Sequence, residues 1–206
     1  MQSAKFCRDL DVLRSCTGGY ADQYEAILKK GNTMSGAIRR AFRQSSRKLL
    51  WPAFSSYVIP VVTYCSPAWN PVLKKDIIAI EKIQRKFTKH ITGLNHLPYL
   101  ARVRQLGVLT LENRRIFSDM VVVYSAIHGQ SNCSTDQLGL VLANCNTRGR
   151  GRRLVPGIPK SVLSRSLFCN RVPPIWNCLP DYIINRCSLS TFKRCLKKYL
   201  LSTQTF

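Results

Sequence analysis

Apolar side chains recur at three- and four-residue intervals in several stretches of the chain, and this spacing predicts a mainly α-helical fold. In the first stretch, residues 20–50, the apolar residues that repeat at intervals of four are Met34, Ile38 and Phe42. A second stretch follows Asn70 and Pro71, a pair suited to capping and opening a helix, and Gly93 is suited to ending it. Its apolar stripe consists of Leu73, Ile77, Ile80, Phe87 and Ile91.

The second half of the chain is expected to combine further helices with an irregular segment. Pro98 and Gly107 bracket a short helix, and a longer one follows. Across residues 130–188 the glycines and prolines interrupt regular structure, so we expect an irregular segment that is basic and partly ordered. The chain then closes with a helix capped by Ser188 or Ser190. The apolar face of this last helix is formed by Phe192, Cys195, Leu196, Tyr199 and Leu200.

Residues 49–73 carry no charged side chain and are long enough to span a bilayer, so a membrane span has to be weighed. The segment also contains four prolines, each of which removes a backbone donor from a helix interior. They are Pro52, Pro60, Pro67 and Pro71. We therefore expect a buried, interrupted helix and no membrane span, with a membrane-associated basic protein as an alternative.

The charge of the chain is strongly positive and unevenly distributed. Lys plus Arg number 32 against 10 Asp plus Glu, which gives a formal net charge of +22 over 206 residues. In a compact protein, so many positive charges repel one another. The commonest partner of such a protein is a phosphate backbone, ahead of an anionic membrane surface or an acidic protein. No acidic residue lies between Glu25 and Asp76, or between Asp136 and Asp181. A solvated protein face is the alternative explanation for each of these basic clusters.

Several of these cations form rows on the predicted helices. Arg39, Arg43 and Arg47 repeat at intervals of four beside the first apolar stripe. The next helix carries like-charge pairs four residues apart, which cost an isolated helix a few tenths of a kcal/mol each and suggest a nearby anion. These pairs are Lys82 with Lys86 and Arg85 with Lys89. Arginines separated by flexible glycines suit contact with a nucleic-acid backbone. They are Arg148, Arg150, Arg152 and Arg153.

No set of residues predicts catalysis. Residues 20–23, Tyr-Ala-Asp-Gln, differ from the Tyr-Ala-Asp-Asp of reverse transcriptases by the missing second carboxylate, and their surroundings predict a helix. The three histidines have no nucleophile and carboxylate at suitable spacing. The segment 149–153 lacks the Lys-Ser/Thr pair of a phosphate-binding loop. The chain alone is therefore not expected to be an enzyme.

The cysteines do not predict a metal site. The chain has nine cysteines without any Cys-x-x-Cys pair, whereas structural zinc sites usually draw ligands in such close pairs. We expect no metal and no cofactor. The odd number of cysteines, together with the lack of a signal peptide after Met1, favours reduced thiols in a cytoplasmic or nuclear protein.

Three stretches resemble one known family. Residues 64–71 read YCSPAWNP and are followed by the basic helix expected at 74–86, residues 106–115 read LGVLTLENRR, and Trp176-Asn177 and Leu179-Pro180 precede a Ser190–Leu200 helix. In this order they resemble the region downstream of the polymerase core in reverse transcriptases of jockey-like non-LTR (LINE-type) retrotransposons. The resemblance extends over nearly the whole chain.

The resemblance implies a helical, thumb-like bundle and a C-terminal extension that hold template and primer. It adds Arg114 and Arg115 to the cations expected to contact an RNA or RNA–DNA duplex, largely independently of sequence. The expected divisions are residues 1–70, 71–130 and 131–206. The catalytic aspartates are absent, so polymerisation would need a separate core. A truncated transposon reading frame without function is the alternative.

Overall fold

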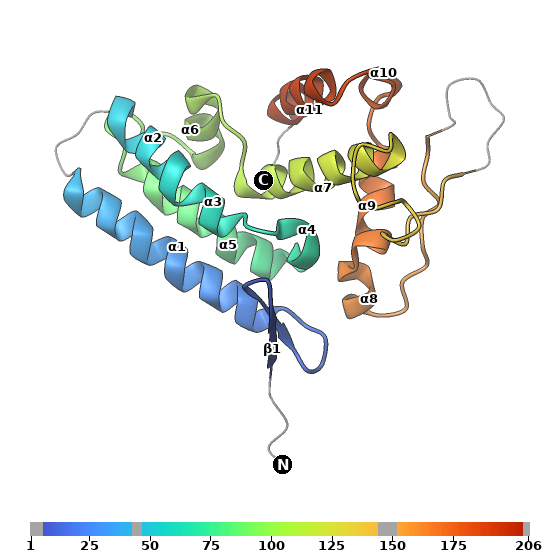
Figure 1. The fold of residues 1–206 in the computed structure, drawn as a ribbon. Helices are drawn as coiled ribbons and strands as arrows, with labels where there is room; N and C mark the ends of the chain where they lie inside the picture. Colours follow the sequence, from blue (N-terminus) through green and yellow to red (C-terminus); the bar gives the residue numbers. More distant parts are fainter. Residues whose placement is uncertain (1–5, 43–46, 144–151, 204–206) are drawn as a thin grey trace, which may run out of the picture. The chain divides into compact units, whose positions relative to one another are not determined.

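The computed structural model describes residues 6–42, 47–143 and 152–203, and this part of the chain is mainly helical, as predicted (Figure 1). A short hairpin of β1 (Phe6–Asp9) and β2 (Val12–Ser15) precedes the helices. The sequence pattern did not predict this hairpin. The helices are α1 (Ala21–Ala41), α2 (Arg47–Tyr57), α3 (Ile59–Val62), α4 (Ser66–Trp69), α5 (Lys74–Lys89), α6 (Tyr99–Leu106), α7 (Leu111–Ile127), α8 (Val162–Ser166), α9 (Phe168–Asn177), α10 (Asp181–Ile184) and α11 (Leu189–Thr203).

The chain divides into two compact units. Among the described residues, the first unit comprises residues 6–42, 47–65 and 73–114, and the second comprises residues 66–72, 115–143 and 152–203. This division differs from the three consecutive segments expected from the sequence, because the short stretch 66–72 joins the later part of the chain. One boundary falls inside α7, between Arg114 and Arg115.

The first unit is built around α1 and α5, which lie side by side (Figure 1). Helix α1 buries Ile27, Gly31, Ser35 and Ile38 at intervals of three or four residues, which is the expected stripe for a one-sided helix. Across from it, α2 and α5 stack Phe54 on Phe87 with ring centres 4.2 Å apart. The core of this unit is therefore made by α1, α2, α3 and α5 together.

The apolar stretch 49–73 is an interrupted series of helices, as predicted. Helices α2, α3 and α4 follow one another there, and Phe54, Val58 and Val62 are completely buried. Pro60 stands in the first turn of α3, where a missing N–H costs no helical hydrogen bond. Among the helices that the structure describes, none is both long enough and apolar enough to cross a membrane.

The expected helix start at Asn70-Pro71 is wrong. Helix α5 begins at Lys74 after Leu73, and the Asn70 side chain serves the second unit instead. Its amide nitrogen donates to Asp119 Oδ2 at 2.9 Å, and its carbonyl oxygen accepts from Arg115 Nε at 2.9 Å. A buried carboxylate and guanidinium need such partners, and this need outweighs the capping preference. The expected end of α6 at Gly107 is confirmed, because this residue caps the helix with φ 65°. The expected end at Gly93 is wrong, since α5 ends at Lys89 and His90 is its C-cap.

The second unit is more regular than the prolines predicted. Helix α9 contains Pro173 and Pro174, yet it buries Val172 and Trp176 completely. The indole nitrogen of Trp176 also donates to the carbonyl oxygen of Arg152 at 2.8 Å. Burying two such side chains offsets the lost backbone bonds, so tertiary packing outweighs local preference. The closing helix is confirmed as α11, and Ser188 Oγ accepts from Thr191 N at 3.3 Å as its cap.

Helix α1 approaches α3 and α5 closely at Gly31, so substitutions at this residue test the packing of the first unit. A Cβ atom there would lie 2.8 Å from Ile83 Cδ1 and 3.0 Å from Val62 Cγ2, whereas at Gly36 the nearest atom is Arg40 Nη1 at 3.5 Å. We expect Gly31→Leu to lower the free energy of unfolding by about 1–3 kcal/mol through overpacking. The matched change Gly36→Ala should raise it by up to about 1 kcal/mol through helix propensity. Urea unfolding followed by circular dichroism measures both, and equal effects would contradict the packing of α1 on α5.

Candidate nucleic-acid interface

One face of α5 carries a row of lysines. Lys75, Lys82, Lys86 and Lys89 are all exposed, and at 100° per residue they occupy about 60° of the helix circumference. The opposite face buries Ile80, Ile83, Gln84 and Phe87 against the first unit. We call these four lysines the lysine row. From Lys75 to Lys89 the row is about 21 Å long, at 1.5 Å per residue.

The C-terminal end of α1 adds positive charge beside this row. Arg39 Nη1 lies 2.6 Å from His90 Nε2, directly after α5, while Gly31 faces Ile83 earlier in both helices. The two helices therefore run in the same direction, and their C-terminal ends meet. Arg39 and Arg40 are both exposed there. The predicted contacts Arg39, Lys82, Lys86 and Lys89 thus lie in one unit, on two neighbouring helices.

The Arg39–His90 hydrogen bond defines the protonation state of the histidine. A guanidinium only donates, so His90 Nε2 accepts and the ring is neutral with its proton on Nδ1. Desolvation lowers the pKa of His90 below its usual 6.5, and the charges of Arg39 and Lys89 lower it further. The local excess of positive charge therefore opposes protonation of the ring.

The prediction that Arg115 contacts phosphate is wrong. Its side chain is completely buried in the second unit, where Nε donates to Asn70 and its charge faces Asp119. The carboxylate of Asp119 also accepts from Arg171 at 3.0 Å. Burial raises the pKa of Asp119, and the two arginines and Asn70 oppose that rise. Arg115 balances a buried charge and cannot reach a phosphate.

The remaining expected contacts have different surroundings. Arg114 is half-buried in the first unit; burial lowers the pKa of its guanidinium, and the charge of Glu81 opposes this. Arg153 donates to the carbonyl oxygens of Asn177 and Leu179 and pairs with Asp181, so it ties residues 152–155 to α9 and α10. Arg153 therefore serves the fold of its own unit, and Arg114 lies near the charge of Glu81.

Four further expected contacts cannot be placed, because the side chain of Arg47 and all of Arg43, Arg148 and Arg150 lie outside the described residues. Arg152 is half-buried, with Nη1 3.5 Å from the carbonyl oxygen of Ile184. Arg85 is also half-buried, and its guanidinium carbon lies 5.1 Å from the centre of the Tyr99 ring. Arg85 thus lies at the border of the lysine row.

Sequence reasoning did not single out Lys75, which belongs to the lysine row, or Arg40, which is exposed at the end of α1. Lys75 precedes Lys82 by seven residues, which is two helical turns, so its membership of the same row has a signal in the sequence. Arg40 has no comparable signal, because it neighbours Arg39 in sequence and points elsewhere around the helix. Its place at the end of α1 became apparent only from the packing of α1 on α5.

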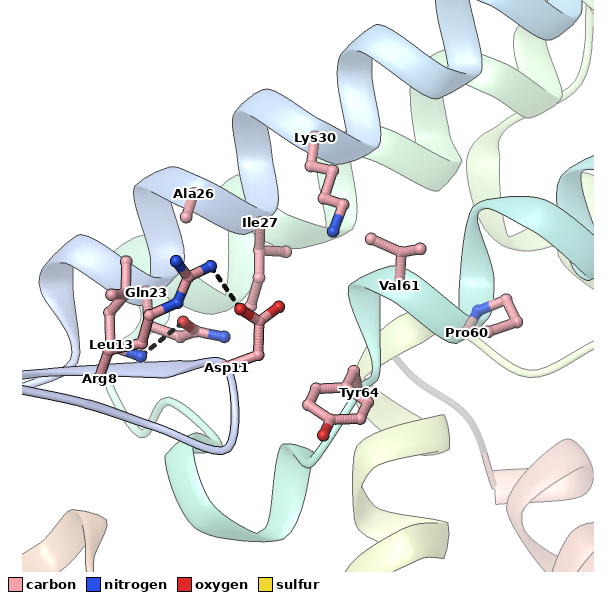
Figure 2. Close-up of a pocket in the computed structure, with 10 residues that line it drawn as sticks. All are labelled: Arg8, Asp11, Leu13, Gln23, Ala26, Ile27, Lys30, Pro60, Val61 and Tyr64. Carbon is pink, nitrogen blue, oxygen red and sulfur yellow. Dashed lines mark hydrogen bonds and ion pairs between the residues drawn. The ribbon is translucent and has the colours of Figure 1, made fainter.

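A separate pocket of about 450 Å³ lies at the other end of α1, between the hairpin, α1 and α3 (Figure 2). Its floor is apolar and includes Ile27 and Val61. Arg8 of the hairpin is paired with Asp11, and the Lys30 side chain extends from α1 into the space between α1 and α3 (Figure 2). With one internal ion pair and one further cation, this pocket carries much less charge than the lysine row.

Within the described residues, histidine, cysteine, aspartate and glutamate side chains form no group of three or more that could hold a metal ion. Their eight cysteines are free thiols. Comparison of the chain with protein-family models, curated proteins and solved structures finds no match.

The environment of His90 makes a measurable prediction. In an NMR titration its ring should show a pKa below 6.5, and Arg39→Gln should raise that pKa, because it removes a neighbouring positive charge. Lys75→Gln removes the same charge about 20 Å further along the helix and should leave the pKa unchanged. A His90 pKa that does not respond to Arg39→Gln would mean that the ends of α1 and α5 do not meet as described.

Proposed function

We propose that this chain binds nucleic acid as the thumb-like, C-terminal part of a retrotransposon RNA-directed DNA polymerase. In this role it holds an RNA or RNA–DNA duplex by its phosphates and does no chemistry itself. The observation that carries the proposal is the lysine row on α5, extended by Arg39 at the end of α1. The sequence resemblance supplies the family, and the exposed cations supply the physical means of binding.

The chemistry of the row favours phosphate as its partner. The two acids of α5 lie away from it, since Glu81 is completely buried and Asp76 is half-buried in the first turn. Four ammonium groups without an intervening carboxylate repel one another. This repulsion is relieved when phosphates replace the counterions near them.

The row offers contacts to a backbone and none to bases. Single-strand binders usually combine cations with aromatic side chains on which unpaired bases stack. The one aromatic residue of α5 is Phe87, and it is buried in the core. Lysines that meet only phosphates position a duplex without identifying its sequence. Binding is therefore expected to vary little between unrelated sequences and to weaken steeply with salt.

A separate polymerase core is the second partner in this proposal. Several large apolar side chains of the first unit are exposed, among them Leu10, Tyr57 and Tyr64, which are 77%, 64% and 51% exposed. Where such side chains form one continuous patch, they favour contact with another protein surface. Without that core the chain would bind a template–primer duplex and leave it unextended.

Removing two charges from the row tests the proposal. The double variant Lys82→Gln/Lys86→Gln should weaken binding to unrelated duplex sequences by similar factors. It should also reduce the slope of log affinity against log salt by about two, since each lost phosphate contact removes roughly one unit. Fluorescence anisotropy of a labelled RNA–DNA duplex over a salt series measures both quantities.

The control for this test is Lys197→Gln/Lys198→Gln, which removes the same charge from exposed positions of α11 in the second unit. The proposal expects its slope to stay close to that of the unmodified chain. If both double variants weaken binding equally, the attraction is to the net charge and the lysine row is no interface. A loss confined to one sequence would contradict backbone recognition.

A further inference from the structure

A second basic feature of the first unit is concave. A pocket of about 640 Å³ lies where the end of α5 meets the start of α6. Its lining includes Arg85 and Lys89 from α5, Arg102 from α6, and His96 from the loop between these helices. Among the described residues that line it there is no aspartate and no glutamate. Three cations therefore border one hollow without a carboxylate among them.

The guanidinium group of Arg102 is held in place before any ligand arrives. Arg102 is only 4% exposed, and it donates from Nε to Thr88, from Nη1 to Leu97 O at 2.7 Å, and from Nη2 to Arg85 O at 3.1 Å. The guanidinium carbons of Arg85 and Arg102 lie 5.1 Å and 5.6 Å from the centre of the same Tyr99 ring. Donors fixed in this way lose little entropy when an anion binds.

The carboxylate of Glu81, which is bonded to the pocket residue Tyr99, also has other hydrogen-bond donors. Glu81 accepts from the Tyr99 hydroxyl and from the backbone N–H groups of Leu111 and Glu112, both at 3.0 Å. Burial lowers the pKa of Arg102, and the neighbouring charge of Arg85 lowers it further. An anion in the pocket would reduce the repulsion between these like charges.

The start of α6 adds to the positive electrostatic potential of the pocket. Pro98 caps this eight-residue helix, and Tyr99 and Leu100 of its first turn line the pocket. The first backbone N–H groups of a helix have no acceptor within the helix, and they favour an anion near them. The helix terminus therefore reinforces the three cationic side chains.

We infer that this pocket binds a phosphate group of the nucleic-acid strand, held between Arg85, Lys89, Arg102 and the start of α6. The inference rests in part on the proposed function, because Lys89 also belongs to the lysine row and makes the pocket continuous with it. A volume of about 640 Å³ exceeds what one phosphate fills, so the attached sugar also has room. The lysine row would then attract the duplex, and the pocket would fix one phosphate at a defined point.

Binding of inorganic phosphate tests the pocket independently of nucleic acid. In amide NMR spectra at constant ionic strength, phosphate should shift the Tyr99 and Leu100 signals saturably, whereas chloride should not. Lys89→Gln should weaken phosphate binding by about tenfold, the usual effect of losing a charge-assisted hydrogen bond. Lys82→Gln removes the same charge from the same helix outside the pocket and should have little effect. His96→Glu, at an exposed loop position, should abolish the shifts without disturbing the core.

Duplexes of one sequence with a 5′-phosphate or a 5′-hydroxyl identify the source of the phosphate. If the terminal phosphate binds, the phosphorylated duplex should bind more tightly, and Lys89→Gln should remove that difference. If a backbone phosphate binds, both duplexes should bind equally, and Lys89→Gln should weaken both more than Lys82→Gln does. The inference is overturned if phosphate produces no saturable shift, or if Lys89→Gln and Lys82→Gln weaken duplex binding equally. Equal weakening would leave the lysine row, and with it the proposed function, intact.

Discussion

The rotation of α5 about its own axis is the constraint on which the rest of the first unit depends. Three polar residues on its buried face are each tied to a neighbouring part of the first unit. Glu81 accepts from the first N–H groups of α7, Gln84 Nε2 donates to Leu109 O at 3.1 Å, and Thr88 Oγ1 accepts from Arg102 Nε of α6 at 3.2 Å. Turning the helix would leave a buried carboxylate without donors, which costs several kcal/mol. The lysine row faces outward because the opposite face of α5, with its bonded polar residues, has to stay buried.

Lysine and arginine are distributed differently between surface and interior. Every lysine whose side chain the structure describes is exposed. Arg102, Arg115 and Arg171 are at most 8% exposed, and each donates to oxygen atoms of its own unit. A planar guanidinium is more weakly hydrated than an ammonium group and can reach several acceptors at once, so it tolerates burial better. The net charge of +22 therefore overstates the positive charge that is available to a partner.

This distribution explains which parts of the site were predictable. The apolar stripe of α5 indicated its buried face, and the lysines opposite it followed from helical periodicity. The burial of Arg115 could not be predicted from helical periodicity, because its partners Asn70 and Asp119 are 45 and four residues away in the sequence. Arg102 stands between Leu100 and Val103 with no pattern that marks it as a pocket residue.

The fold was predictable where local chemistry decided it. Gly107, with φ 65°, ends α6 as expected, since few residues other than glycine adopt that conformation readily. Helix α5 ends at Lys89, before Gly93. The hairpin was missed because its turn uses Leu10 and Asp11 at φ 44° and 65°, without the Asn-Gly or Asp-Gly pair that usually signals such a turn. Helix α9 was missed because the burial of Trp176 outweighs two prolines, and burial is decided by distant parts of the chain.

The central claim is that folding collects the exposed lysines of α5 into a single surface for phosphates. Lysine acetylation followed by mass spectrometry, with and without a bound RNA–DNA duplex, tests this most directly. The account predicts that the duplex protects Lys75, Lys82, Lys86 and Lys89, while Lys193, Lys197 and Lys198 of α11 react as fast as in the free protein. Uniform protection of all these lysines, or protection of α11 alone, would contradict it.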